Sequence, residues 1–370
     1  MPISRAELPE EFFDMTSPRL LRQPEPKYLY AGLFKAALAI ELGVPDAVGL
    51  GDRAIQGQGA PYTPADADRL ALAQDLGFNE LFAITVNHTG TPGHTLRFNR
   101  PAFTDSTYTQ AARQIGSNQT ISVVPITAGS EQANLTIKRF GGPYDNTNTR
   151  VAPFALDNFD ASMGVHNLAR FIGTHLQRDF DKTLESFWVT LIDTVSADTT
   201  HIVYPDGMTA DNDATSAGQF PATYEQLSRT SRKMDEANLP TLGDGRRVLV
   251  MTPMGKKQLK DDPQFARYAK DFPETNPLIS MGWFATIPEF HCFVSNTLTT
   301  TNNSSSVAIH KGHALAPGAL FGGSGKPPRV AASTDDNYGE TAKVLWLAYL
   351  SLGLADQRFG FQVRYAADAG

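Results

Sequence analysis

The sequence predicts an α+β protein, in which strands and helices occupy separate stretches of the chain. Residues 79–157 show the alternating apolar pattern of short strands, and residues 161–193 carry the strongest helical pattern. The regular alternation of strand and helix that indicates a doubly wound parallel sheet does not occur. Neither an internal repeat nor a compositional break separates independent domains.

The length and composition of the chain argue against several classes of protein. The 370 residues are enough for one large domain or two ordinary ones, each with a full core. A net charge of −7 argues against wrapping nucleic acid by neutralising its phosphates. The single cysteine, Cys292, excludes an intramolecular disulfide and a cysteine-cluster metal site. The chain starts without the apolar core of a signal peptide. Its most apolar run, 344–355, is shorter than the about 20 residues of a membrane span, so we expect no membrane insertion.

The amino-terminal region predicts an extended arm followed by short helices. Five prolines fall within residues 1–26, a density that blocks helix continuation and favours extended chain. Between 27 and 42 apolar residues recur at spacings of three and four, which indicates a short amphipathic helix. Thr63 and Pro64 favour a second helix to about Leu76, with threonine as its cap.

Residues 79–157 are predicted to be strands. Phe82, Ile84 and Val86 alternate with polar positions, and Leu96 and Phe98 alternate after a glycine-rich turn, so we expect a long β-hairpin here. Short strands are also expected around 121–123, 135–137 and 151–155.

A long helix follows. Ser162 can cap it, no proline falls within 161–193, and the helix would be roughly 45 Å long. We interpret it as a packing element that carries no site. Its apolar stripe comprises Val165, Leu168, Ile172, Leu176, Phe180, Leu184, Trp188 and Leu191.

The remainder of the chain mixes short elements. Polar loops are expected at 197–218 and 295–306, and a glycine- and proline-punctuated run at 282–294. Predicted helices are 224–237, 256–260 and 265–268, and predicted strands are 247–251, 307–309, 344–354 and 359–364.

Motifs for catalysis or cofactor binding are not found. The run ending in Lys326 is not a phosphate loop, because Leu320 replaces a required glycine and Pro327 replaces the following serine or threonine. The acidic run 211–213 lacks the glycine and glutamate of a calcium loop. The eight histidines lack zinc-ligand spacing, and Cys292 in an apolar strand is typical of an inert buried thiol. We therefore predict a protein that is not an enzyme, without catalytic, metal or cofactor-binding residues.

Several short motifs occur in an order that resembles the major capsid proteins of tailed bacteriophages, which have the Hong Kong 97-like fold. A glycine turn, strand and proline at 245–253 precede a Lys-Asp-x-x-x-Phe element at 260–265. A Gly-to-Ser-Asn segment at 282–296 and a strand with His-Lys-x-x-Ala at 306–316 follow, and 359–363 resembles the terminal strand. The resemblance covers about 79–367.

This resemblance implies a domain map. The arm and first helix would be 1–42, and the axial domain 197–340. The peripheral domain would combine 43–196 with 341–370, including the extended loop at about 79–118 and a spine helix at about 161–193.

The resemblance also implies a structural role. Hexamers and pentamers of the chain would close into an icosahedral phage head that encloses double-stranded DNA without reading its sequence. Expected partners are a portal protein at one vertex and a decoration or cement protein. The location would be the virion capsid, assembled in the cytoplasm of a bacterial host.

Two departures from the family refine these expectations. Some members join subunits through a lysine in the extended loop, but residues 79–137 contain no lysine, so covalent cross-linking is not expected. Others begin with a long, charged scaffold segment, and only 26 residues precede the first predicted helix here, so a separate scaffolding protein is expected. The hold on neighbours would then come from strand pairing, apolar contact and arginine–carboxylate pairs.

The residues predicted to contact neighbouring subunits lie in the loop and on the 224–237 helix. In that helix the basic residues are balanced by acidic ones, which is typical of a solvated face or a subunit contact. The candidates are Phe82, Arg97, Phe98, Arg100, Phe103, Arg113, Arg229 and Arg232.

Two alternatives stay open. An encapsulin-type nanocompartment shares the fold and encloses cargo enzymes, although encapsulins are generally shorter. A hydrolase that uses paired carboxylates belongs to a different class, and it would be a monomer with catalytic turnover.

Overall fold

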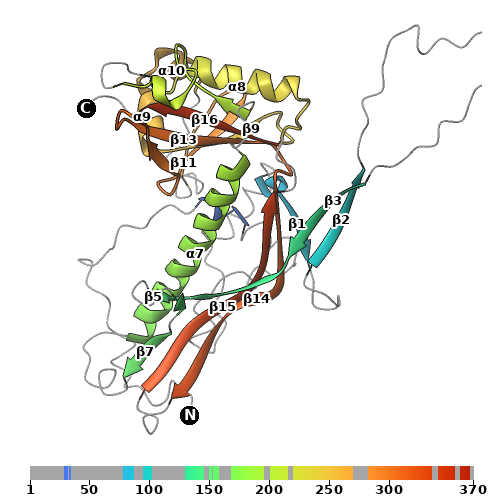
Figure 1. Cartoon of the computed structure of the whole chain (residues 1–370), viewed down its shortest axis with the longest axis vertical. Coiled ribbons are helices and arrows are strands. Elements are labelled where there is room, and N and C mark those ends of the chain that lie inside the picture. Colours follow the sequence, from blue (N-terminus) through green and yellow to red (C-terminus); the bar gives the residue numbers. More distant parts are fainter. Residues whose placement is uncertain are drawn as a thin grey trace, which may run out of the picture.

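In the described residues, the computed structural model shows two large β-sheets that are both contacted by one long helix, and two further sheets of two strands each (Figure 1). The mixture of sheets and separate helices confirms the predicted α+β class. The structure describes residues 29–31, 33–34, 78–86, 95–101, 130–145, 150–151, 153–157, 168–195, 201–215, 220–269, 282–335, 341–354 and 359–366.

The long helix, α7 (Leu168–Val195), contacts both sheets and lies between them (Figure 1). Its 28 residues make it about 42 Å long. Leu176, Phe180, Leu184 and Trp188 are buried, so the predicted apolar stripe faces the core. The spine helix is thereby confirmed from Leu168 onward, and residues 161–167, with their expected cap, lie outside the described residues.

The first sheet has five strands in the order β1-β14-β15-β4, and β7 also pairs with β15. Two of its strands, β14 and β15, form a long antiparallel ribbon beside α7 (Figure 1). The ring of Trp346 on β15 packs edge-on against Phe180 of α7, 5.1 Å between centroids. The strands are β1 (Phe82–Val86), β4 (Lys138–Gly142), β7 (Phe154–Asp157), β14 (Leu320–Asp335) and β15 (Thr341–Leu354).

The expected hairpin between residues 82–86 and 96–98 is wrong. Strand β1 runs parallel to β14, with Phe82 opposite Leu320, and β2 (Thr95–Pro101) pairs instead with β3 (Ser130–Thr136). Apolar alternation identifies a strand without naming its partner. Pairing with β14 places Phe82 in the core, which a two-stranded ribbon cannot provide.

The second sheet has seven strands in the order β10-β11-β9-β13-β16-β8, with β12 also on β13. Every residue of the parallel pair β9 and β11 is buried. The strands are β8 (Ile202–Val203), β9 (Arg247–Met251), β10 (Trp283–Thr286), β11 (Phe290–Val294), β12 (Thr300–Asn302), β13 (Ala308–Leu315) and β16 (Gly360–Ala366).

Three helices lie beside this sheet (Figure 1). Each begins at a side-chain cap. Helix α8 (Tyr224–Glu236) is capped by Thr223, α9 (Pro253–Asp261) by Thr252 and α10 (Pro263–Tyr268) by Asp262. Each cap oxygen accepts a backbone N–H of the first turn. The predicted helices at 224–237, 256–260 and 265–268 and the strand at 247–251 are confirmed.

The remaining elements are short. They are two 3-10 turns, η4 (Phe78–Leu81) and η7 (Asp211–Asp213), and a small hairpin of β5 (Tyr144–Asp145) with β6 (Arg150–Val151). The expected loop at 295–306 contains the exposed strand β12, which pairs antiparallel with β13. The second predicted helix, near Thr63, lies outside the described residues.

The division of the strands between the two large sheets does not follow the expected domain boundary between residues 340 and 341. Strand β14 lies in the five-stranded sheet although it precedes that boundary, and β16 lies in the seven-stranded sheet although it follows it. The chain therefore crosses between the sheets near 319 and again between β15 and β16. No change in composition marks either crossing, because both sheets need the same apolar residues.

Candidate functional site

The β2–β3 ribbon carries three of the predicted interface residues. Arg97, Phe98 and Arg100 lie on β2, and Arg100 is opposite Glu131 of β3 in the backbone register. Within the described part of the chain these two strands pair only with each other, and Figure 1 shows the ribbon extending away from the larger sheets. An isolated two-stranded ribbon is marginal in water, so a neighbouring surface would stabilise it. Phe103 and Arg113 lie outside the described residues.

Phe82 occupies a different environment from the ribbon residues. Its side chain is 5% exposed and packs against the rings of Phe34 and Trp188, with centroid separations of 5.7 and 5.2 Å. Phe82 thus contributes to the core of the subunit itself, where it links β1 to α7.

Arg229 and Arg232 lie on α8, and each pairs within the subunit. Arg229 lies 2.7 Å from Asp206, and Arg232 lies 3.3 Å from Glu236 one turn further on. Arg232 is 69% exposed, and exposed pairs of this kind contribute little stability. The buried residues of α8 are Gln226, Leu227, Thr230, Ser231 and Met234, and neither arginine is among them.

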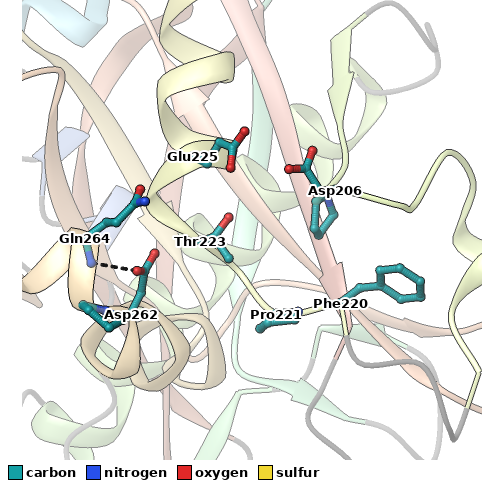
Figure 2. Close-up of a pocket in the computed structure, with 9 residues that line it drawn as sticks. Asp206, Phe220, Pro221, Thr223, Glu225, Asp262 and Gln264 are labelled. Atoms are coloured by element: carbon teal, nitrogen blue, oxygen red, sulfur yellow. Dashed lines mark hydrogen bonds between the residues drawn. The ribbon is translucent and has the colours of Figure 1, made fainter.

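A cleft of about 450 Å³ is lined in part by Asp206, the ion-pair partner of Arg229 (Figure 2). Two of its polar side chains cap the amino-terminal ends of helices. Asp262 accepts the backbone N–H groups of Tyr224 and Gln264, and Thr223 caps α8. Figure 2 shows these groups at one side of the cleft, with Asp206 and Phe220 at the other. The arrangement supplies no set of groups converging on a common reacting atom.

Three residues at the edge of the seven-stranded sheet are arranged as in a hydrolase relay. Nε2 of His291 lies 2.7 Å from Asp244, and its Nδ1 lies 3.1 Å from the hydroxyl of Thr286. Burial lowers the pKa of His291 despite the neighbouring carboxylate of Asp244. Thr286 is only 6% exposed, so the hydroxyl is closed to a substrate. We interpret this line of groups as a link between the turn before β9 and the β10–β11 hairpin.

The described residues contain neither a candidate metal site nor an exposed thiol. That part of the chain contains no group of three or more His, Cys, Asp or Glu side chains able to hold a metal ion. Cys292 is buried, as predicted, and burial raises the pKa of its thiol. Among the described helices, none is long and apolar enough to cross a membrane.

A buried polar joint at the carboxyl-terminal half of α7 was missed from the sequence. Asp193 of α7 accepts a hydrogen bond from Nε2 of His313 on β13 at 3.1 Å. Nδ1 of His313 is hydrogen-bonded to the hydroxyl of Tyr30 at 2.9 Å. Thr299 and Gln362 also donate to Asp193. The joint therefore ties α7 to the seven-stranded sheet and to the helical segment at 29–34.

Glu185, two turns earlier on α7, forms the second half of this joint. Its carboxylate is fully buried and accepts the backbone N–H of Ala31 at 2.9 Å. The hydroxyls of Ser295 and Thr297 donate to its other oxygen at 3.2 and 2.9 Å. The sequence signal for this buried joint was an acidic residue, Glu185, between Leu184 and Trp188 of the apolar stripe.

The two carboxylates of the joint respond oppositely to their surroundings. Burial dominates at Glu185 and raises its pKa to about 7, although the hydrogen bonds it accepts oppose the shift. Burial also acts on Asp193, but hydrogen bonds from His313 and Thr299 outweigh it and lower its pKa. Tyr30 lies between them, and burial together with both negative charges raises its pKa well above the ordinary value.

The arrangement of two sheets, a spine helix and a projecting ribbon is the Hong Kong 97-like fold of phage capsid proteins. No protein-family model and no curated protein matches the sequence. Among solved structures, the capsid of Ralstonia phage GP4 matches with a TM-score of 0.56 and 12% identity, covering 78% of this chain and 87% of that one.

Two cyanophage capsids give similar values. The Pam1 capsid matches with a TM-score of 0.55 and 11% identity, covering 76% of this chain and 87% of that one. The P-SCSP1u capsid matches with a TM-score of 0.53 and 14% identity, covering 79% and 88%. At such low identity these likenesses establish the fold, and they confirm the fold that the sequence motifs predicted.

Proposed function

We propose that the chain is a major capsid protein, which assembles as hexamers and pentamers into an icosahedral phage head around double-stranded DNA. The observation that carries this proposal is the fold, shared over three quarters of the chain with three phage capsid proteins. The role is structural rather than enzymatic. The β2–β3 ribbon supports it, because such a ribbon gains its stability from a neighbouring subunit.

The proposed subunit has three parts. Residues 1–42 form the amino-terminal arm and first helix. The peripheral domain is built on α7 and the five-stranded sheet, including β14, and the axial domain on the seven-stranded sheet, including β16. A portal protein, a separate scaffolding protein and a decoration or cement protein complete the proposed set of partners. The head would be assembled in the cytoplasm of a bacterial host.

The predicted interface residues remain part of this proposal, with their roles divided by position. Arg97, Phe98 and Arg100 would act on the ribbon, and Arg229 and Arg232 on α8. Phe103 and Arg113 remain candidate interface residues. Phe82 would act indirectly, by fixing β1 to α7 within the subunit.

Native mass spectrometry of the purified full-length chain tests the oligomeric claim. Rings of five and six subunits, or larger closed species, are expected. A chain that stays monomeric at high concentration, with the ribbon ordered by hydrogen exchange, would overturn the proposal. Nuclease-protected double-stranded DNA inside particles from infected cells would distinguish a phage head from an encapsulin, which would enclose protein cargo.

A further inference from the structure

Two carboxylates of α7 hold one short segment of the chain. The segment is the described part of the first helix, residues 29–31 and 33–34, and all five of these residues are buried. Glu185 holds it through the backbone N–H of Ala31, and Asp193 holds it through His313 and the Tyr30 hydroxyl. The two contacts lie at adjacent residues of the segment, so they restrain it together.

Glu185 is also the point where three parts of the molecule meet. Besides Ala31, it binds Ser295 and Thr297, which follow β11 of the seven-stranded sheet. Any movement of the segment at 29–34, of α7 or of this sheet relative to the others must break at least one of these hydrogen bonds. The carboxylate is therefore placed where a change in its charge affects the whole joint.

The surroundings of Glu185 provide hydrogen bonds without a compensating charge. No lysine or arginine of the described chain is among its partners, and the residues after β11 contribute only hydroxyls. Tyr30 is a titratable group of the segment at 29–34 that interacts with it, and Tyr30 is in turn hydrogen-bonded to His313, which pairs with Asp193. A buried negative charge in this setting is costly, and the cost disappears if the joint opens to water.

We propose that Glu185 acts as a proton-dependent latch, which holds the segment at 29–34 firmly on α7 when protonated and loosens it when ionised. A pKa of about 7 in the closed joint supports this, because the group then changes charge in the neutral range. In the opened joint the carboxyl would return to its ordinary value of 4.5. The latch is a property of the subunit fold and does not depend on whether the chain forms a shell.

The sign of the effect follows from these two values. Below pH 4.5 the carboxyl is protonated in both states, and above pH 7 it is ionised in both. Between them only the opened state is ionised, so the opening constant rises roughly tenfold per pH unit and then levels off. Between pH 5 and pH 7.5 the total change is roughly fiftyfold.

Hydrogen–deuterium exchange of the full-length protein measures this opening directly. Peptides covering residues 29–34 are followed from pH 4.5 to 8.5, and rates are corrected for the intrinsic pH dependence of amide exchange. The wild type is expected to lose protection up to about pH 7 and then to level off. Glu185→Gln keeps an oxygen that can accept from Ala31 but cannot ionise, so its corrected protection should fall far less between pH 5 and pH 7 than that of the wild type.

A matched control and a milder variant sharpen the test. Glu225→Gln makes the same change at an exposed carboxylate of α8 and should keep the wild-type pH profile. Ser295→Ala removes one hydrogen bond that favours the ionised form of Glu185, so exchange should level off at a higher pH. This variant also decides the matter if Glu185→Gln does not fold. Corrected exchange independent of pH in the wild type, or a wild-type profile in Glu185→Gln, would overturn the latch.

Discussion

At the residue scale, the carboxylate of Glu185 has a consequence for global stability. Its pKa is raised from 4.5 unfolded to about 7 folded, so the folded state binds more protons between these values. The contribution of Glu185 to stability is therefore largest below pH 4.5 and falls by about 3 kcal/mol as the pH rises to 7. Urea denaturation of wild type and Glu185→Gln should show this difference developing between pH 4.5 and 7. Parallel pH profiles for the two proteins would contradict it.

Gly142 is a second residue where a small change should have a large effect. A Cβ added there would lie 2.2 Å from the carboxylate of Asp179 and 2.4 Å from the indole nitrogen of Trp346. These two groups form a 2.7 Å hydrogen bond that ties β15 to α7. Gly142→Ala should cost about 1–3 kcal/mol in unfolding free energy, measured by chemical denaturation. Gly243→Ala meets nothing within 4 Å and serves as the control, and equal losses in both would contradict the packing described.

At the element scale, α7 is held by aromatic packing around Trp188. Its ring is fully buried, with Phe34 at 5.4 Å and Phe82 at 5.2 Å. Trp188→Ala should cost about 3–5 kcal/mol, because it leaves a cavity where three elements meet. Thr190→Ala, on the exposed side of the same helix, should cost far less. Denaturation of both variants measures the difference, and wild-type stability in the tryptophan variant would mean that this face of α7 is misassigned.

The β2–β3 ribbon leads to a prediction about how subunits are joined. Residues 79–137 contain neither lysine nor cysteine, so the ribbon lacks the amine for an isopeptide bond and the thiol for a disulfide. Boiled and denatured particles should therefore run as a single band near 40.2 kDa on a gel. A ladder of covalent multimers would show that another segment supplies a cross-link.

The elements also show what the sequence could and could not predict. Helix α7 was predictable because its apolar period is local, and α8, α9 and α10 because their caps are local. The pairing of β1 could not be predicted, because its partner β14 lies more than two hundred residues away in the chain. The buried joint was hidden for the same reason: Tyr30 and His313 are 283 positions apart, and neither belongs to a recognisable motif.

At the scale of the whole molecule, the fold separates a body with a shared apolar core from a two-stranded ribbon. Two sheets and α7 share an apolar core with the helical segment at 29–34, whereas the β2–β3 ribbon forms a separate two-stranded sheet. In such a subunit the two large sheets and α7 are stabilised by their own core, and the β2–β3 ribbon would be stabilised further by contact with a neighbour. That division is what we expect of a protein whose function is to build a shell from copies of itself.

Electron cryo-microscopy of particles assembled from the full-length chain tests this central claim most directly. We predict closed icosahedral shells in which the two large sheets and α7 of the subunit occupy every capsomer and the β2–β3 ribbon lies on an adjacent subunit. A preparation that contains only monomers, or particles whose subunits contact one another without the ribbon, would contradict it.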